Sequence, residues 1–307
     1  GMERVAPHLP DGEGFSVDVV ERMVAGKVRN FGASSKFEAT EDNTSNRVCL
    51  VEFFTNSFLG NGSRGAIGGA LANEGLTGHF PMENVAFLSY HLPDERLDPL
   101  INELAEDTAA MLGVPGPWVH VIDGVNKANG AGRWSDAEKI YNEVRELVTA
   151  RLEGPSKFTM ELEGSVVDGV CKGALIVRGD ARRKTRVQIV LAEKGVLFPG
   201  STEVFVHRYL ARAALTDSTD GVEWDPDDED KMELPFEVSL EDIRAENEAY
   251  LDELCEDTDG VVRKLSMSID PAQVRFIGTV RDSRSGRVLQ AIAVDPTNLA
   301  ELEEAGR

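Results

Sequence analysis

LVEFFTNSFLGNGSRG, residues 50–65, joins an apolar run to a glycine-rich loop, and small residues typical of a helix follow it. As text, residues 60–65 match the pattern G-x-G-x-x-G of dinucleotide-binding proteins. In those proteins the first glycine ends the strand directly, and an acidic residue closes the next strand to hold the ribose. Here residues 55–59 separate the apolar run from Gly60, and the next apolar run ends in His91. The context therefore argues against a dinucleotide site.

The sequence from Val48 to about Glu153 alternates between strand and helix patterns, which is typical of an α/β unit. Runs of apolar and β-branched residues predict three strands, at 48–54, 84–91 and 118–123. Three helices are predicted, at 66–75 ending at Gly75, at 93–112 with Gly113 as the C-cap, and at 135–152 with Ser135 as the N-cap and Glu138 completing a capping box. Residues 1–46 form a polar arm with one expected helix at 16–28.

After Gly154 and Pro155 the pattern changes to many strands with short turns, which is typical of a β-sandwich. The turn RSGR at 284–287 predicts a hairpin between the last two strands. An acidic loop is expected at 217–231 and a helix at 239–255. The strands are predicted at 157–167, 171–179, 185–193, 201–210, 233–240, 272–282 and 286–295.

The opening stretch resembles the first strand and active-site loop of thioredoxin-like proteins, in the version Val-Glu-x-Phe-Thr-x-x-x-Cys-x-Asn-Cys-Pro. On this pattern Leu59 and Gly62 stand at the two cysteine positions, Asn61 at the asparagine and Ser63 at the proline. The run VAFLSYH, which ends at His91, resembles the second strand of the same family.

A second segment, MLGVPGPWVHVIDG at 111–124, resembles the part of these proteins in which a cis-proline faces the active site. On this resemblance Pro117 is the candidate for that proline, and Pro115 is the alternative. Trp118 follows directly and is expected near the former active site, more as a core residue than as a contact.

The resemblance extends into the second half of the chain. The segments IVLAEKGVLFPGSTEVFVHRYLARAAL, at 189–215, and GTVRDSRSGRVLQAIAVDP, at 278–296, are similar to the β-sandwich of the outer-membrane-protein-28-related lipoproteins. The acidic loop and the helix near 242–255 depart from that pattern. The resemblance implies a two-domain α+β protein, in which a thioredoxin-like α/β domain at 47–154 precedes an immunoglobulin-like antiparallel β-sandwich at 155–307.

Thiol–disulfide exchange needs one thiolate to attack and a second thiol to resolve the mixed disulfide. Leu59 and Gly62 supply neither, so no oxidoreductase activity and no catalytic residue are expected. The resemblance therefore implies a redox-inactive protein, without a cofactor, that acts in protein or peptide binding or in assembly. The candidate binding residues are those of the former active site: Leu59, Gly60, Asn61, Gly62, Ser63, Arg64, Pro117 and Trp118.

Two other ligands are alternatives. A phosphorylated ligand or nucleotide is the first, because loop glycines at a helix start allow close approach of an anion and Arg64 adds a positive charge. Calcium is the second, because the acidic loop offers several carboxylates. The calcium candidates are Asp217, Asp220, Asp225 and Asp227; their spacing is not that of an EF-hand, so no metal is expected there.

The composition limits the partners further. Lys and Arg total 32 and Asp and Glu total 54, a formal net charge of −22, which disfavours binding to nucleic acids or anionic membranes. Three widely spaced cysteines are not a disulfide framework. The start GMERVAPHLPDGEG lacks the features of a signal peptide, and Gly1 before Met2 resembles a cloning remnant, so a cytoplasmic protein is expected. The alternative, if Met2 is internal, is an exported protein from which the signal peptide has been removed.

The histidines offer no clear site in the sequence. Ser89, His91 and Asp94 contain the residue types of a hydrolase triad, but neighbours along one strand point to opposite faces. His120 and His207 lie in strand patterns and are expected to be structural.

Overall fold

The computed structural model describes residues 36–37, 46–58, 66–94, 97–179, 184–198, 206–224, 231–257 and 268–297. The helix expected at 16–28 and residues 225–230 of the acidic loop lie outside this set. None of the helices within these ranges is both long and apolar enough to cross a membrane.

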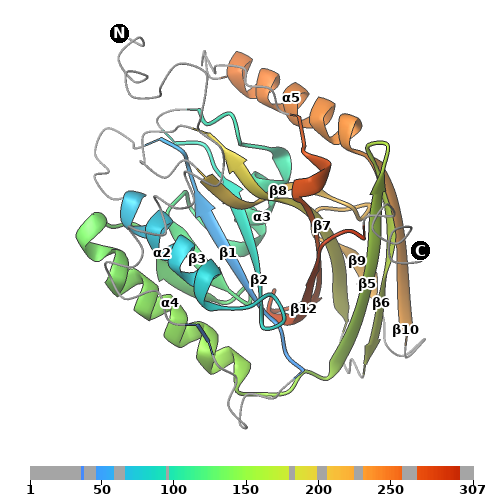
Figure 1. Cartoon of the computed structure of the whole chain (residues 1–307), viewed down its shortest axis with the longest axis horizontal. Helices are drawn as coiled ribbons and strands as arrows, with labels where there is room; N and C mark the ends of the chain where they lie inside the picture. The colour runs from blue at the N-terminus through green and yellow to red at the C-terminus, as the bar shows by residue number, and fades with distance from the viewer. Residues whose placement is uncertain are drawn as a thin grey trace, which may run out of the picture.

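The first part of the chain forms a thioredoxin-like arrangement (Figure 1). Strand β1 pairs in parallel with β2, and antiparallel with β3, which in turn pairs with β4. Helices α2 and α4 pack on one face of these strands, and α3 packs on the other. The bounds are β1 Cys49–Thr55, α2 Ala66–His79, β2 Val85–His91, α3 Glu103–Leu112, β3 Val119–Ile122, β4 Asn126–Asn129 and α4 Ala137–Leu152.

The second part adds strands to the same sheet and builds a second one. The large sheet has the order β12-β11-β7-β8-β2-β1-β3-β4, with β9 also paired to β7, and the small sheet has the order β10-β6-β5. Helix α5 follows β10 and packs, through Leu240 and Ile243, on a core formed by buried side chains of both sheets. The bounds are β5 Phe158–Val167, β6 Val170–Gly179, β7 Thr185–Leu197, β8 Val206–Ala214, β9 Val222–Trp224, β10 Lys231–Ser239, α5 Leu240–Asp257, β11 Val274–Asp282 and β12 Val288–Val294.

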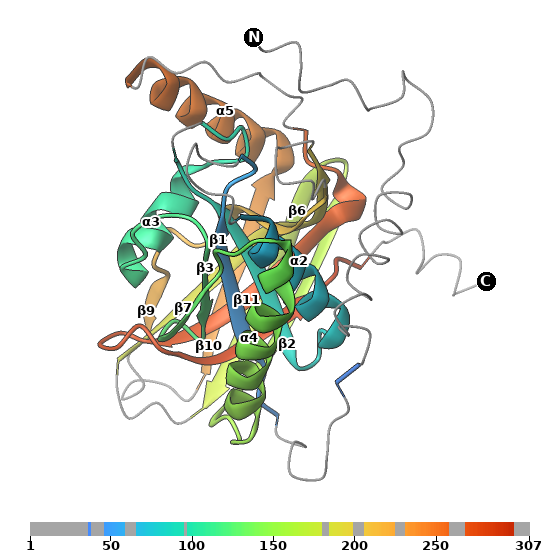
Figure 2. The same cartoon turned by 90° about the vertical axis from the view of Figure 1, so that its left-hand side faces the viewer.

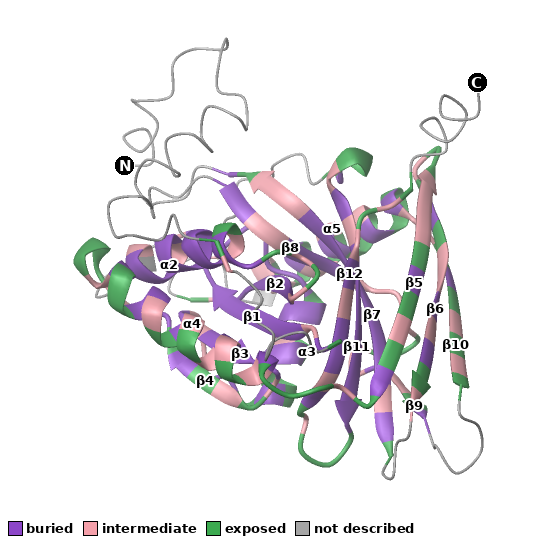
Figure 3. Cartoon of the chain, turned by 60° about the horizontal axis from the view of Figure 1, so that its bottom comes forward, coloured by how far each residue is buried: buried purple, intermediate pink, exposed green. Residues whose placement is uncertain are grey.

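The two parts share one continuous sheet, which curls so that its far end reaches β1. β2 and β8 meet at the single pair Ser89 and Leu210. Buried side chains of α3, β1 and β2 form one core with those of β7, β8, β11 and β12. Figure 2 shows the molecule turned by 90°, and Figure 3 shows the central strands mostly buried and the outer strands of the small sheet largely exposed on one face. The structure is thus a mixed α/β fold with two sheets.

Several predicted elements differ from those observed. Helix α2 continues through Gly75 to His79, because buried Leu71, Ala72 and Leu76 hold it on the sheet and one glycine costs a helix only about 1 kcal/mol. The helix predicted at 93–112 begins only at Glu103, where the Asn102 side chain accepts a hydrogen bond from the Ala105 amide as N-cap.

The third predicted helix also begins later than expected. Ser135 lies in a 3-10 turn at Trp134–Asp136, and α4 starts at Ala137, so Ser135 is not the N-cap. Strands β4 and β9 were not predicted; β9 lies inside the expected acidic loop. The C-cap at Gly113, with φ of 60°, and the hairpin of β11 and β12 are confirmed.

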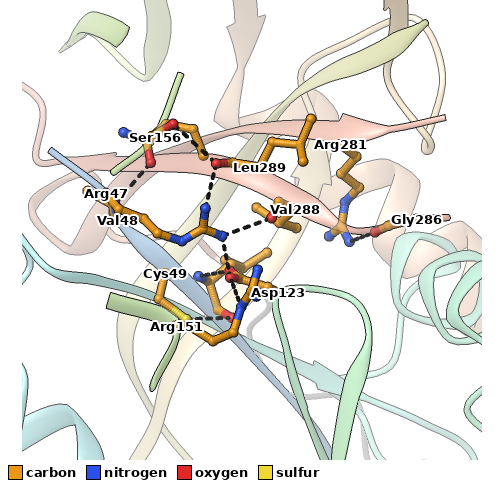
Figure 4. Close-up of polar contacts among 12 residues, drawn as sticks. Arg47, Val48, Cys49, Asp123, Arg151, Ser156, Arg281, Gly286, Val288 and Leu289 are labelled. Carbon is orange, nitrogen blue, oxygen red and sulfur yellow. Dashed lines mark hydrogen bonds and ion pairs between the residues drawn. The ribbon is translucent and has the colours of Figure 1, made fainter. Parts of the chain in front are cut away.

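Buried ion pairs and hydrogen bonds hold the first part of the chain to β12 and β11, and Figure 4 shows those around Asp123. Asp123 accepts hydrogen bonds from Arg47 at 2.5 Å and from Arg151 at 2.8 Å, and Arg47 also donates to the Val288 carbonyl at 3.1 Å. Glu52 on β1 pairs with Arg281 on β11 at 2.5 Å. All of these carboxylates are fully buried, so each depends on its arginine for neutralisation.

Candidate functional site

The loop predicted as the binding site, Leu59 to Arg64, lies outside the described residues. Before it, residues 56–58 follow the end of β1 at Thr55, and after it α2 starts at Ala66. The loop therefore joins a buried strand to a helix N-terminus, as the thioredoxin resemblance implies.

The proline segment differs from the expectation. All described peptide bonds are trans, so neither Pro117 nor Pro115 is the cis-proline that the resemblance implied. Trp118 has a φ of 72°, donates its N–H to the Phe54 carbonyl at 2.7 Å and accepts from the Gly130 amide at 2.7 Å. Its side chain is 7% exposed and packs on Phe53, as a core residue does. The backbone N–H and carbonyl of Trp118 are thus already used within the protein.

A buried polar cluster that the sequence did not reveal lies beside the start of the loop. It consists of Ser57, His91, Asp98 and His207. His91 Nδ1 is 2.6 Å from Asp98 Oδ2, and the Ser57 amide also donates to this carboxylate. The Ser57 hydroxyl is 3.4 Å from His91 Nδ1 and 3.5 Å from His207 Nε2. The cluster therefore fixes the chain just before the loop to both β2 and β8.

The charges of this cluster follow from burial and pairing. Burial alone would raise the pKa of Asp98, but His91, His207 and the Ser57 amide together lower it to about 2. Burial and the neighbouring His91 lower the pKa of His207 to about 3. At neutral pH, Asp98 is ionised and His207 is neutral, with its Nε2 donating to the Phe198 carbonyl at 3.1 Å.

The cluster lacks the geometry of a hydrolase triad. In a triad the serine and the carboxylate contact opposite nitrogens of the histidine, whereas here both contact Nδ1 of His91. The adjoining cavity has a volume of about 20 Å³, is lined by His91, Asn73 and Glu74 among others, and admits one water molecule but no substrate. The cluster is therefore structural, and the Ser89 and Asp94 of the sequence hypothesis play no part in it.

None of the three thiols is placed for exchange chemistry. Cys49 and Cys171 are buried, and burial raises the pKa of Cys171 to about 12 and that of Cys49 well above its usual value. Cys255 is half-buried on α5. The raised pKa values of Cys49 and Cys171 leave little thiolate at neutral pH, and thiolate is the reactive form.

Of the four calcium candidates in the acidic loop, the structure describes two, Asp217 and Asp220. Asp220 forms an ion pair with Arg186 at 2.9 Å and accepts a hydrogen bond from the Ser218 hydroxyl. Asp217 is exposed. Asp225 and Asp227 lie outside the described residues. Within the described ranges, no three His, Cys, Asp or Glu side chains are grouped as metal ligands.

The pH dependence of stability is expected to come from buried neutral histidines. His120 stacks on Phe53 at 4.2 Å, neither ring nitrogen has a partner among the described residues, and burial lowers its pKa to about 3. The folded pKa is below the unfolded value of 6.5, so stability is intact above pH 6.5 and is lost as the pH falls toward 3.

We predict that, on going from pH 7.5 to pH 5, the free energy of unfolding of His120→Leu falls by about 2 kcal/mol less than that of the wild type, since one pKa unit is worth about 1.36 kcal/mol. Urea unfolding of the wild type and the variant at pH 7.5 and pH 5 measures it, with the pH 7.5 pair as the control for packing. Parallel losses of stability in both proteins between these pH values would show that His120 is not a source.

Comparison with known proteins gives a fold but no family. No family model matches the chain, and no curated protein matches it. HBP35 of Porphyromonas gingivalis is similar in structure, with a TM-score of 0.57 and 13% identity over 82% of this chain and 76% of that one. A domain of the outer membrane lipoprotein Omp28 from the same organism has a TM-score of 0.30 and 14% identity, over 47% of this chain and 90% of that one.

The chain thus has a thioredoxin-like fold. It is shared with HBP35 over most of both chains, at an identity that says nothing of activity. The immunoglobulin-like form of the sandwich is not established by these comparisons. The expectation of a cytoplasmic protein is contradicted by these comparisons, in which HBP35 and the Omp28 domain are the similar structures. We withdraw that expectation, and the likeness alone assigns no other compartment.

Proposed function

We propose that this protein is a redox-inactive thioredoxin-like protein that binds a protein or peptide at the loop between β1 and α2. The observation that carries the proposal is the loss of both thiols: Leu59 and Gly62 occupy the positions that carry cysteine in the resembling family. The remaining thiols are buried or half-buried and lie outside the loop.

The surroundings of the loop support a binding role in place of thiol–disulfide exchange. The cluster of Ser57, His91, Asp98 and His207 holds the chain rigidly on the β1 side, and α2 begins on the other. The free N–H groups at a helix start carry a partial positive charge and favour a negatively charged partner. Arg64 adds a full positive charge to the loop, in a chain that is otherwise acidic. An acidic peptide fits these conditions.

The test uses short peptides selected on the whole protein by phage display and measured by fluorescence anisotropy. We expect the selected peptides to be acidic, and Arg64→Ala to weaken them about tenfold, the effect of about 1.4 kcal/mol. The matched control is Arg284→Ala, at an exposed arginine in the β11–β12 turn. Equal affinity for the wild type and Arg64→Ala would reject the loop as the binding site.

The nucleotide and calcium alternatives stay predictions. Thermal unfolding with NAD, NADP, ATP, calcium and EDTA at fixed salt tests them, because a ligand at a hundred times its dissociation constant adds about 2.7 kcal/mol of stability. A nucleotide effect that Arg64→Ala abolishes would replace the peptide proposal, and a calcium effect reversed by EDTA would direct attention to Asp217 and its neighbours.

A further inference from the structure

A second cavity lies where the two parts of the chain meet. Its volume is about 290 Å³, close to the lower end of the range of small-molecule sites. Its walls come from the end of α2, the segment after it, β2, β8, β11 and the arm residues Lys36 and Phe37. Ligand pockets are frequent at such junctions.

Aromatic rings form the walls of this cavity. Phe37 lies 5.3 Å from Phe80 between ring centres, and its N–H donates to the His79 carbonyl at 2.8 Å, so the arm closes one side. Phe87 stacks on Tyr209 at 5.9 Å on another side. These rings offer flat faces and edges to a planar ligand.

The lining of the cavity carries basic side chains, although the protein as a whole is acidic. Its described lining includes Lys36, His79 and Arg275 and no carboxylate, although the chain carries 54 acidic and 32 basic residues. Arg275 is held by Asp295 at 2.7 Å, and its guanidinium lies 4.9 Å from the Tyr209 ring centre. Lys36 is exposed and has no ion-pair partner among the described residues. Its ammonium group is thus available for an anion at the mouth of the cavity.

Tyr209 is held in an unusual backbone conformation. Its φ is 51°, in the left-handed region that tyrosine seldom occupies within a strand. This conformation costs free energy, and it accompanies a ring that stacks on Phe87 and lies under Arg275. The residue with this strained backbone is thus one that forms a wall of the cavity.

We infer that this cavity binds a small aromatic carboxylate, either as a free acid or as the aromatic C-terminal residue of a polypeptide. The ring lies among Phe37, Phe87 and Tyr209, and the carboxylate faces Lys36. The inference does not depend on the loop at 59–65, so either proposal can fail alone.

Isothermal titration calorimetry of the whole protein with 3-phenylpropionate and its neutral amide tests the inference. We expect the acid to bind about tenfold more tightly than the amide, and Lys36→Gln to remove that difference. The matched control is Lys139→Gln, at an exposed lysine of α4, which is expected to leave both affinities unchanged. Equal binding of acid and amide, or no binding of either at about 10 mM, would overturn the inference.

A second variant tests the aromatic wall. Phe37→Leu keeps an apolar side chain but removes one ring, and it is expected to weaken the acid and the amide by the same factor. Unchanged affinity for both probes would place the binding elsewhere and overturn the inference. The peptide Ala-Ala-Phe distinguishes the two sources of the carboxylate: tighter binding than 3-phenylpropionate indicates a polypeptide C-terminus, and weaker binding indicates a free acid.

Discussion

Replacing Asp123 by asparagine is expected to lower the free energy of unfolding by about 3 to 5 kcal/mol, the usual cost of breaking a buried ion pair by removing one partner. Asparagine fits the left-handed backbone at this position, where φ is 49°, and keeps an oxygen for the Leu50 amide. The loss therefore comes from the charge, because Arg47 and Arg151 lose their common carboxylate.

Urea unfolding of Asp123→Asn measures this effect, and Asp217→Asn, at an exposed aspartate, is the matched control. The Arg47→Met, Asp123→Asn double variant is expected to lose less than the sum of the single variants, since no unpaired guanidinium of Arg47 remains. A loss below about 1 kcal/mol in Asp123→Asn would mean that water, and not Asp123, stabilises the arginines.

Replacing Gly69 by alanine is expected to destabilise the protein by about 3 kcal/mol or more, at the upper end of the cost of overpacking. A Cβ atom at this position of α2 would lie 1.9 Å from the Gly130 carbonyl oxygen and 2.8 Å from its carbon. Both are backbone atoms, so the helix or the segment after β4 has to move. Glycine here permits the close approach of α2 that the thioredoxin-like packing needs.

The same helix provides the matched control. A Cβ at Gly78 would meet nothing within 4 Å, so Gly78→Ala is expected to stabilise the protein, by up to about 1 kcal/mol. Thermal unfolding of both variants measures the opposite signs. If Gly69→Ala is as stable as the wild type, α2 does not pack on Gly130 as described.

Much of the thioredoxin-like part could be predicted because its elements carry strong local patterns. Strands β1 and β2 are mostly apolar and are buried along their whole length, and α4 has an apolar stripe and a polar face. β4 was not predicted because its sequence, NKAN, is mostly polar, and β9 was not predicted because three residues are too few for a periodic pattern.

The buried polar groups could not be predicted from the sequence. Ser57 and His207 are 150 residues apart, and only the pairing of β2 with β8 brings them together. Glu52 is separated from Arg281 by 229 residues, and its position on a buried strand face gave no sign of its partner. Such contacts depend on the closure of the whole sheet, and no local pattern encodes it.

The measurement that tests the central claim most directly is reduction of insulin disulfides with dithiothreitol as the electron donor. The rate with this protein is compared with that of a variant carrying Cys49→Ala, Cys171→Ala and Cys255→Ser. We predict that the wild type and the cysteine-free variant leave the uncatalysed rate unchanged, because no thiol stands at position 59 or 62. A rate that the wild type raises and the cysteine-free variant does not would contradict the account of a thioredoxin-like fold without thiol chemistry.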